Sequence, residues 1–211
     1  GGRNAVIEAA ANNDCGVVEA LLAHRAGLNH QDAMGRSALI EACAEGNATV
    51  VFQLLASRGL TPAEDSALFS SPFIADKSAS SSKLYPDEDS KLDLDSQDWN
   101  GRSALICACE EGHAEIAVAL IKGGADMSIC SKSSDVATDK SFGRTALIEA
   151  CERGLGAVVE AFVAAGADLD QTDRRGRTPL IAACMWGHDD IAKGIVLYMS
   201  CTSRTVTDTL Q

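Results

Sequence analysis

The chain has 211 residues, of which 46% are hydrophobic, and a formal net charge of −12 at pH 7. This charge disfavours nucleic acid as a partner, because binding to phosphates depends mainly on cationic side chains. No apolar run is long enough for a membrane-spanning helix, so no membrane association is predicted.

Residues 4–31 predict a first pair of short helices. Ile7 lies 33 positions before Ile40, in a similar sequence context. The apolar face of the second helix of this pair consists of Val17, Val18, Leu21 and Leu22. No complete hairpin precedes the pair, and its outer face is polar through Asn4, Glu8 and Asn12. We therefore expect a capping unit. Arg25 stands where later units have glycine.

Residues 32–60 predict the second helix pair, with Ser37 as the N-cap of its first helix and Gly46 as the stop. Its opening pattern, DAMGRSALIEACAEG, recurs in DWNGRSALICACEEG from Asp98, KSFGRTALIEACERG from Lys140 and DRRGRTPLIAACMWG from Asp173. Gly143 and Gly176 are 33 positions apart. The chain is therefore built from sequence repeats with this period.

Residues 61–97 interrupt the period. This stretch is rich in serine and proline and strongly acidic, which predicts a flexible insertion without a core of its own. An alternative is a hidden sixth repeat, because Ser71-Pro72-Phe73 echoes Thr178-Pro179-Leu180 and Gly35 lies two periods before Gly101. The absence of helical apolar spacing afterwards favours the insertion.

Three more repeats follow, at about 98–130, 140–172 and 173–200. A smaller insertion is predicted at 131–139. The second helix of the last repeat is expected to run from Asp189 to about Met199. Beyond it, two alternatives remain: the stack continues, or the tail folds back over its last face.

The period and the motif resemble ankyrin repeats, best in Gly176-Arg177-Thr178-Pro179-Leu180 followed by Gly187-His188. This resemblance implies an all-α ankyrin-repeat solenoid of about five repeats, made of helix-turn-helix units joined by short hairpin-like loops. Isoleucine replaces the histidine that is usual in the motif, at Ile40, Ile106, Ile148 and Ile181.

The cysteines and histidines suggest structural roles. Four of the eight cysteines occupy one equivalent place in the repeats: Cys43, Cys109, Cys151 and Cys184. Stacked helices lie about 8–10 Å apart, too far for disulfides, so small buried hydrophobes and a reducing compartment, cytoplasmic or nuclear, are expected. His113 and His188 occupy the Gly-His position of the repeat. No cofactor, metal or catalytic set is predicted.

The resemblance places partner binding at the hairpin tips and at the exposed ends of the first helices. The predicted contact residues are Met34, Arg36, Glu45, Trp99, Arg102, Glu110, Glu111, Phe142, Arg144, Arg153, Arg175, Arg177, Met185 and Trp186. Trp99, Phe142 and Trp186 are the expected hot spots, because large aromatic side chains favour interfaces. Packing between adjacent tips is the alternative for the aromatic residues. The alternative for the repeated arginines is that each one braces an acidic residue of its neighbour. These arginines are Arg36, Arg102, Arg144 and Arg177.

These features predict a non-enzymatic scaffold that binds a protein or peptide partner along its concave face. The alternative is a regulatory or targeting domain of a larger enzyme, channel or adaptor. In that case the acidic insertion would act as a lid or phosphorylated tether, with Ser90 among acidic neighbours.

Overall fold

The computed structural model describes residues 2–58, 91–132 and 143–207, with 201–207 as helical backbone only. Within these ranges the helices are α1 (Ala5–Ala11), α2 (Cys15–Ala23), α3 (Ala38–Ala44), α4 (Ala48–Ser57), α5 (Ala104–Glu111), α6 (Ala114–Lys122), α7 (Ala146–Arg153), α8 (Gly156–Ala164), α9 (Pro179–Met185) and α10 (Asp189–Thr207). The described residues form no strand, only one isolated bridge between Cys130 and Thr145. The expected all-α solenoid is confirmed.

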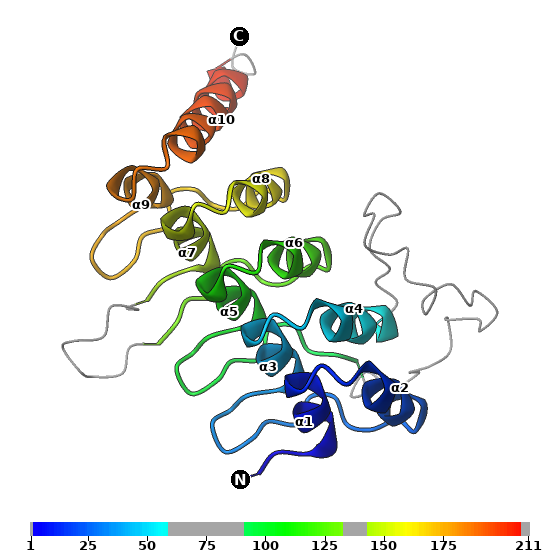
Figure 1. Cartoon of the computed structure of the whole chain (residues 1–211). Coiled ribbons are helices and arrows are strands. Elements are labelled where there is room, and N and C mark those ends of the chain that lie inside the picture. The colour runs from blue at the N-terminus through cyan, green and yellow to red at the C-terminus, as the bar shows by residue number, and fades with distance from the viewer. Residues whose placement is uncertain (1, 59–90, 133–142, 208–211) are drawn as a thin grey trace.

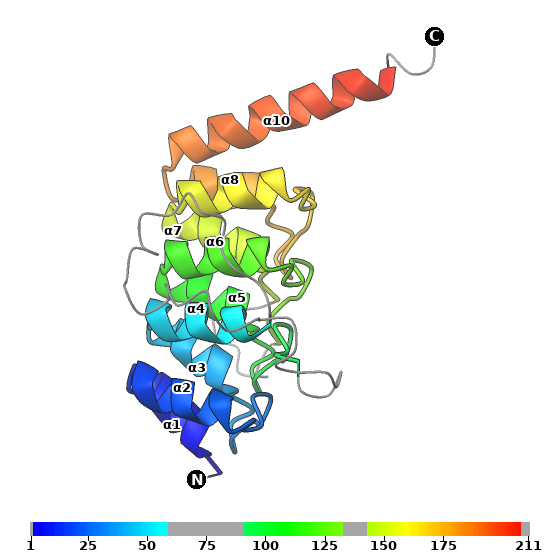
Figure 2. The ribbon, with the colours of Figure 1, turned by 90° about the vertical axis from the view of Figure 1, so that its right-hand side faces the viewer.

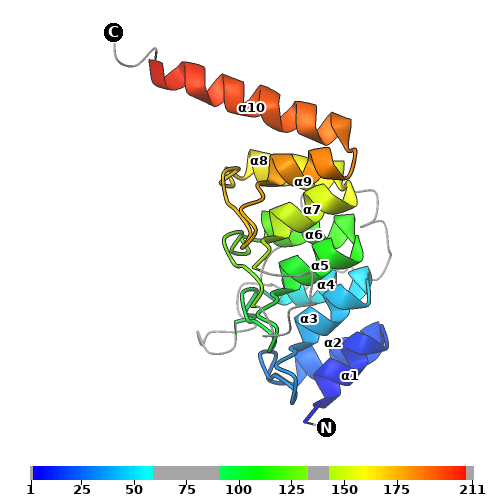
Figure 3. The same cartoon turned by 90° about the vertical axis from the view of Figure 1, so that its left-hand side faces the viewer.

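The helices form two layers. Each odd-numbered helix packs against the next odd-numbered one, and each even-numbered helix against the next even-numbered one (Figure 1). Figure 2 shows the even-numbered layer from outside, and Figure 3 shows the odd-numbered layer with the hairpin loops beside it. The odd-numbered, or inner, helices and the hairpins therefore share one side of an elongated stack.

Every inner helix begins at a polar cap. The side-chain oxygens of Asn4, Ser37, Ser103, Thr145 and Thr178 each accept a hydrogen bond from the backbone N–H three residues later, at 2.9 to 3.4 Å. Such caps satisfy N–H groups that the helix itself leaves unpaired. The predicted cap at Ser37 is confirmed.

The insertion is shorter than the sequence predicts. Residues 91–97 belong to the stack, because Leu92 and Leu94 are buried in the core. Asn29 of the first repeat donates a side-chain hydrogen bond to the Lys91 carbonyl at 2.8 Å and accepts one from the Asp93 N–H at 2.8 Å. The remainder of the predicted insertion, 61–90, lies outside the described residues.

Helix α3 packs directly against α5, as α1 does against α3 and α5 against α7. The second and third repeats are therefore direct neighbours in the stack. This packing leaves no place between them for a sixth repeat.

The fourth repeat begins at Ser131, not at Lys140. The Ser131 N–H donates to the Arg144 carbonyl at 3.1 Å, and its hydroxyl accepts from the Arg144 N–H at 3.2 Å. In the next repeat Asp173 makes the same backbone bond, to Arg177. Ser131 and Lys132, which the sequence assigns to the insertion at 131–139, therefore belong to the fourth repeat, and residues 133–139 lie outside the described residues.

The last repeat differs from the others in two ways. Helix α10 continues to Thr207, well past the expected Met199, and extends beyond the other helices in Figures 2 and 3. Ile181 is 44% exposed and Cys184 is also exposed, whereas their counterparts in the preceding repeats are buried. The expected burial of Cys184 is wrong, because no further inner helix among the described residues covers this face of α9.

Arg25 occupies a left-handed backbone position with φ of 55°, where the third and fourth repeats have Gly124 and Gly166 at φ of 81° and 76°. Left-handed backbone is costly for residues with a β-carbon. We expect Arg25→Gly to raise the free energy of unfolding by about 1 kcal/mol, measured by urea denaturation. Arg58→Gly is the control, because Arg58 follows α4 with φ of −80° and gains nothing from glycine. A destabilised Arg25→Gly chain would contradict the expectation.

Candidate protein-binding face

The hairpin tips form one continuous edge. The Trp99 N–H donates to the Met34 carbonyl of the preceding tip at 3.0 Å, and the Lys132 N–H donates to the Asn100 carbonyl at 2.6 Å. Each tip is closed by its own backbone bonds, such as the Gly101 N–H to the Asp98 carbonyl at 2.8 Å. The second, third and fourth tips are therefore held in register by hydrogen bonds along the stack.

The first tip residue of a repeat lies across the glycine of the preceding hairpin. A β-carbon on Gly35 would stand 2.9 Å from Trp99 Cδ1, and one on Gly143 would stand 2.9 Å from Arg174 Cγ. Lys132 lies against Gly101 in the same way. We call Trp99, Lys132 and Arg174 the tip row. Glycine, with its positive φ, leaves room for these side chains to lie flat.

Two pairs of large apolar side chains are exposed on this side of the stack. Met34 and Trp99 occupy adjacent tips and are 52% and 73% exposed. Met185 and Trp186, at the end of α9, are 63% and 61% exposed. The sequence predicts all four as contact residues, and the structure places them at the surface in two separate pairs.

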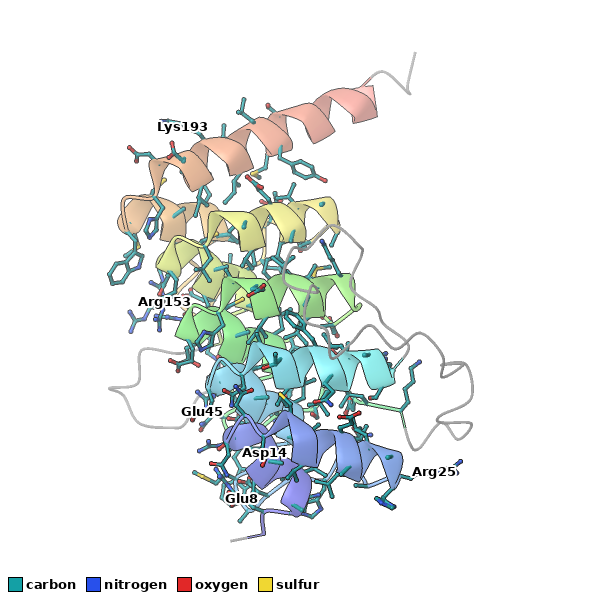
Figure 4. The ribbon with its side chains drawn as sticks, turned by 45° about the vertical axis from the view of Figure 1, so that its right-hand side comes forward. Glu8, Asp14, Arg25, Glu45, Arg153 and Lys193 are labelled. Carbon is teal, nitrogen blue, oxygen red and sulfur yellow. The ribbon has the colours of Figure 1, made fainter. Side chains whose placement is uncertain are left out.

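The ends of the inner helices form a second edge, which is charged. Glu45, Glu111 and Arg153 are exposed at the ends of α3, α5 and α7. Figure 4 shows Glu8, Glu45 and Arg153 along one edge of the stack, with Arg25 on the opposite side. Arg175, also predicted, is exposed at the fifth hairpin tip.

The repeated arginines are largely engaged in ion pairs. Arg36 contacts Glu41 at 2.7 Å, while Arg102 contacts Asp98 and Glu110, both at 3.0 Å. The predicted contact residue Glu110 is therefore half-buried and paired. These pairs support the bracing interpretation, and a partner contact by Arg36 or Arg102 stays a prediction.

A larger charge cluster joins the fourth and fifth repeats. Glu152 lies between Arg144 at 2.7 Å and Arg177 at 2.9 Å, and its side chain is 7% exposed. Arg144 also contacts Glu149 at 2.8 Å, and Arg177 contacts Asp173 at 2.7 Å. Burial acts to raise the pKa of Asp173, but N–H donors from Arg177 and Arg175 hold it below its ordinary value. Burial raises the pKa of Glu149.

Two relevant residues are missing from the sequence prediction. Arg3 pairs with Glu41 and Asp32 of the second repeat, and so extends the arginine series by one. The stretch Gly2-Arg3-Asn4-Ala5, one period before Gly35-Arg36-Ser37-Ala38, carries this signal. Lys132 belongs to the tip row, but the sequence prediction assigns it to the insertion at 131–139. The predicted hot spot Phe142 lies outside the described residues.

The repeat histidines contact the preceding repeat. A β-carbon on Gly46 would stand 2.5 Å from His113 Cε1, and His188 Nε2 lies 3.1 Å from the Glu152 carbonyl oxygen. Both histidines therefore pack between repeats, which agrees with the structural role that the sequence suggests for them.

Burial should protect four cysteines from modification. Cys43, Cys107, Cys109 and Cys151 are buried, and burial raises the pKa of the Cys107 and Cys151 thiols to about 12. Since the thiolate is the reactive form, iodoacetamide at pH 8 should label Cys130 and Cys184 in the native chain, both of which are exposed. Peptide mass spectrometry should find the buried four labelled only after denaturation. Equal labelling of Cys109 and Cys184 in the native chain would contradict this packing.

Two family models match the chain. The model for an ankyrin repeat matches residues 100–132, and the model for three copies of the ankyrin repeat matches residues 128–205. The chain belongs to the ankyrin-repeat family. A search of curated proteins gave no significant match.

Ankyrin repeats are in general modules for protein–protein interaction and are generally not enzymes. In the described part of this ankyrin-repeat chain, no helix has both the length and the apolar character to cross a membrane. Membership of the family therefore directs attention to the surface of the stack, and above all to the tips and helix ends described above.

Proposed function

We propose that this ankyrin-repeat chain is a non-enzymatic scaffold that binds a protein or peptide partner with its tip row and the exposed ends of its inner helices. The single observation that carries the proposal is the exposure of Trp99 and Trp186, each beside an exposed methionine, at repeat positions on one side of the stack. Large aromatic side chains with flat, exposed surfaces are the residues that most often dominate binding energy.

The structure of the tips favours Trp99 as a rigid anchor. Its backbone N–H is fixed to Met34, and its ring lies on Gly35, so little conformational freedom is lost when a partner binds. Exposure of 73% leaves most of the indole available for contact.

The alternative, a regulatory or targeting domain with the acidic insertion as lid or tether, depends on residues 61–90 outside the described part. We keep it as a prediction. A reducing compartment, cytoplasmic or nuclear, also stays a prediction; it is supported by the buried thiols Cys43, Cys107, Cys109 and Cys151, none of which is in a disulfide.

The test is the recovery of partners by alanine variants of the full chain. We expect Trp99→Ala to weaken binding of a recovered partner by at least tenfold, and Trp186→Ala to do so independently, as measured by titration calorimetry. Val17→Ala is the matched control, because Val17 is an exposed apolar residue on the outer helix α2. Partners retained at full affinity by both tryptophan variants would contradict the proposal.

A further inference from the structure

The tip row changes chemical character along the stack. Its first member is the indole of Trp99, with Met34 beside it, and its next members are the cations of Lys132 and Arg174. Arg175 adds a third exposed cation at the fifth tip. One edge of the molecule therefore passes from apolar to basic, on a chain whose net charge is −12.

These cations differ from the other arginines of the inner side. Arg36, Arg102, Arg144 and Arg177 are all paired with carboxylates within 3.0 Å. Across the described residues, no carboxylate lies within ion-pair distance of Lys132, Arg174 or Arg175. Within the described part of the chain, their charges are thus not compensated by an ion pair.

A groove adjoins the basic part of the row. It has a volume of about 510 Å³ between the fourth and fifth hairpins, and both Lys132 and Arg174 line it. Polar side chains of Gln97, Ser128 and Thr172 line it too, as does Asp173, whose carboxylate is engaged by Arg177. The groove can therefore accept a polar or anionic side chain beside the two cations.

The spacing of the row sets the spacing of a ligand. Neighbouring helices in such stacks lie about 8–10 Å apart. An extended segment in the polyproline II conformation has three residues per turn and advances about 3.1 Å per residue, so every third residue lies on one face and would meet the next member of the row. A backbone hydrogen bond from Lys132 to Asn100 joins the third and fourth tips, and each side chain of the row lies against the glycine of the preceding hairpin.

Resting on the proposed binding function, we propose that the tip row binds an extended acidic segment of a partner protein. An aliphatic or aromatic residue of that segment contacts Trp99 and Met34, and acidic residues three and six positions away contact Lys132 and Arg174. The chain's net negative charge opposes an acidic partner at long range. At physiological salt, however, charges beyond about 8 Å are largely screened. The attraction of an acidic segment therefore depends mainly on the nearby cations of Lys132 and Arg174.

The test uses a displayed library of short random peptides selected on the full chain. We expect enriched peptides to carry an apolar residue with acidic residues at the third and sixth positions from it. The tightest peptide, synthesised with a fluorophore, is then titrated by anisotropy. We expect the double variant Lys132→Glu/Arg174→Glu to weaken its binding at least tenfold. Lys122→Glu, an exposed lysine at the end of α6, is the control and should change binding less than twofold.

The milder pair Lys132→Gln/Arg174→Gln keeps the test valid if charge reversal disturbs folding, which circular dichroism would show. If enriched peptides lose affinity with Trp99→Ala but bind both double variants normally, the inference of an acidic ligand is overturned. The proposed binding face at Trp99 would still be supported. Peptides indifferent to Trp99→Ala and to both double variants would overturn the inference and the proposed function together.

Discussion

Glu152→Ala should lower the free energy of unfolding by about 3 kcal/mol, measured by urea denaturation. The Glu152 carboxylate lies between the guanidinium groups of Arg144 and Arg177, whose side chains are only 12% and 13% exposed. Removal of one member of a buried charge cluster leaves the others without compensation, which typically costs about 3–5 kcal/mol. Because Arg177 belongs to the fifth repeat, the packing of the fifth repeat against the fourth should weaken most.

Two variants separate this effect from a general loss of charge. Glu160→Ala removes an exposed acidic residue from α8 and should change stability by less than about 0.5 kcal/mol. Glu152→Gln keeps the shape and one hydrogen-bond acceptor, so its cost should fall between the two. If Glu152→Ala were as mild as Glu160→Ala, the cluster would not join the repeats.

Leu94→Ala should cost about 2–5 kcal/mol of stability, the usual range for a fully buried leucine. Leu94 is 1% exposed in the core, although the sequence pattern assigns it to a flexible insertion. Urea denaturation followed by circular dichroism would measure the loss. A cost near zero would contradict the burial of Leu94 in the core and would assign residues 91–97 to the insertion instead.

Comparison with two other positions sharpens this prediction. Leu169 occupies the equivalent place in the fourth repeat, four positions before Asp173 as Leu94 is before Asp98, and is also buried. Leu169→Ala should therefore destabilise the chain by a similar amount. Val196→Ala, at an exposed site on α10, should have little effect.

The helices of the repeats and the cap at Ser37 could be predicted from the sequence, because the repeat period fixes which residues face the core. Ile40, Ile106 and Ile148 recur at one position and are buried together. The end of the insertion was missed because Leu92-Asp93-Leu94-Asp95 lies directly after an acidic stretch of similar composition. Only the distance of Leu94 from the hairpin residue Asp98 distinguishes this segment from the insertion.

The start of the fourth hairpin was missed for a chemical reason. The other complete hairpins begin with aspartate, whose carboxylate accepts backbone N–H groups within the turn. In the fourth hairpin the Ser131 hydroxyl takes this role. A search guided by Asp and Gly therefore places the repeat start too late and overlooks Lys132. Ile181 is exposed because, among the described residues, no further inner helix packs on α9, and its place in the repeat motif does not show this.

The central claim, that the chain binds partners with its tips and inner helix ends, is tested most directly by hydrogen–deuterium exchange on a complex with a recovered partner. The account predicts slower exchange in the tips around Trp99 and Arg174 and at the end of α9, with α2, α4 and α6 unchanged. Protection confined to those outer helices, with the tips exchanging as in the free chain, would contradict it.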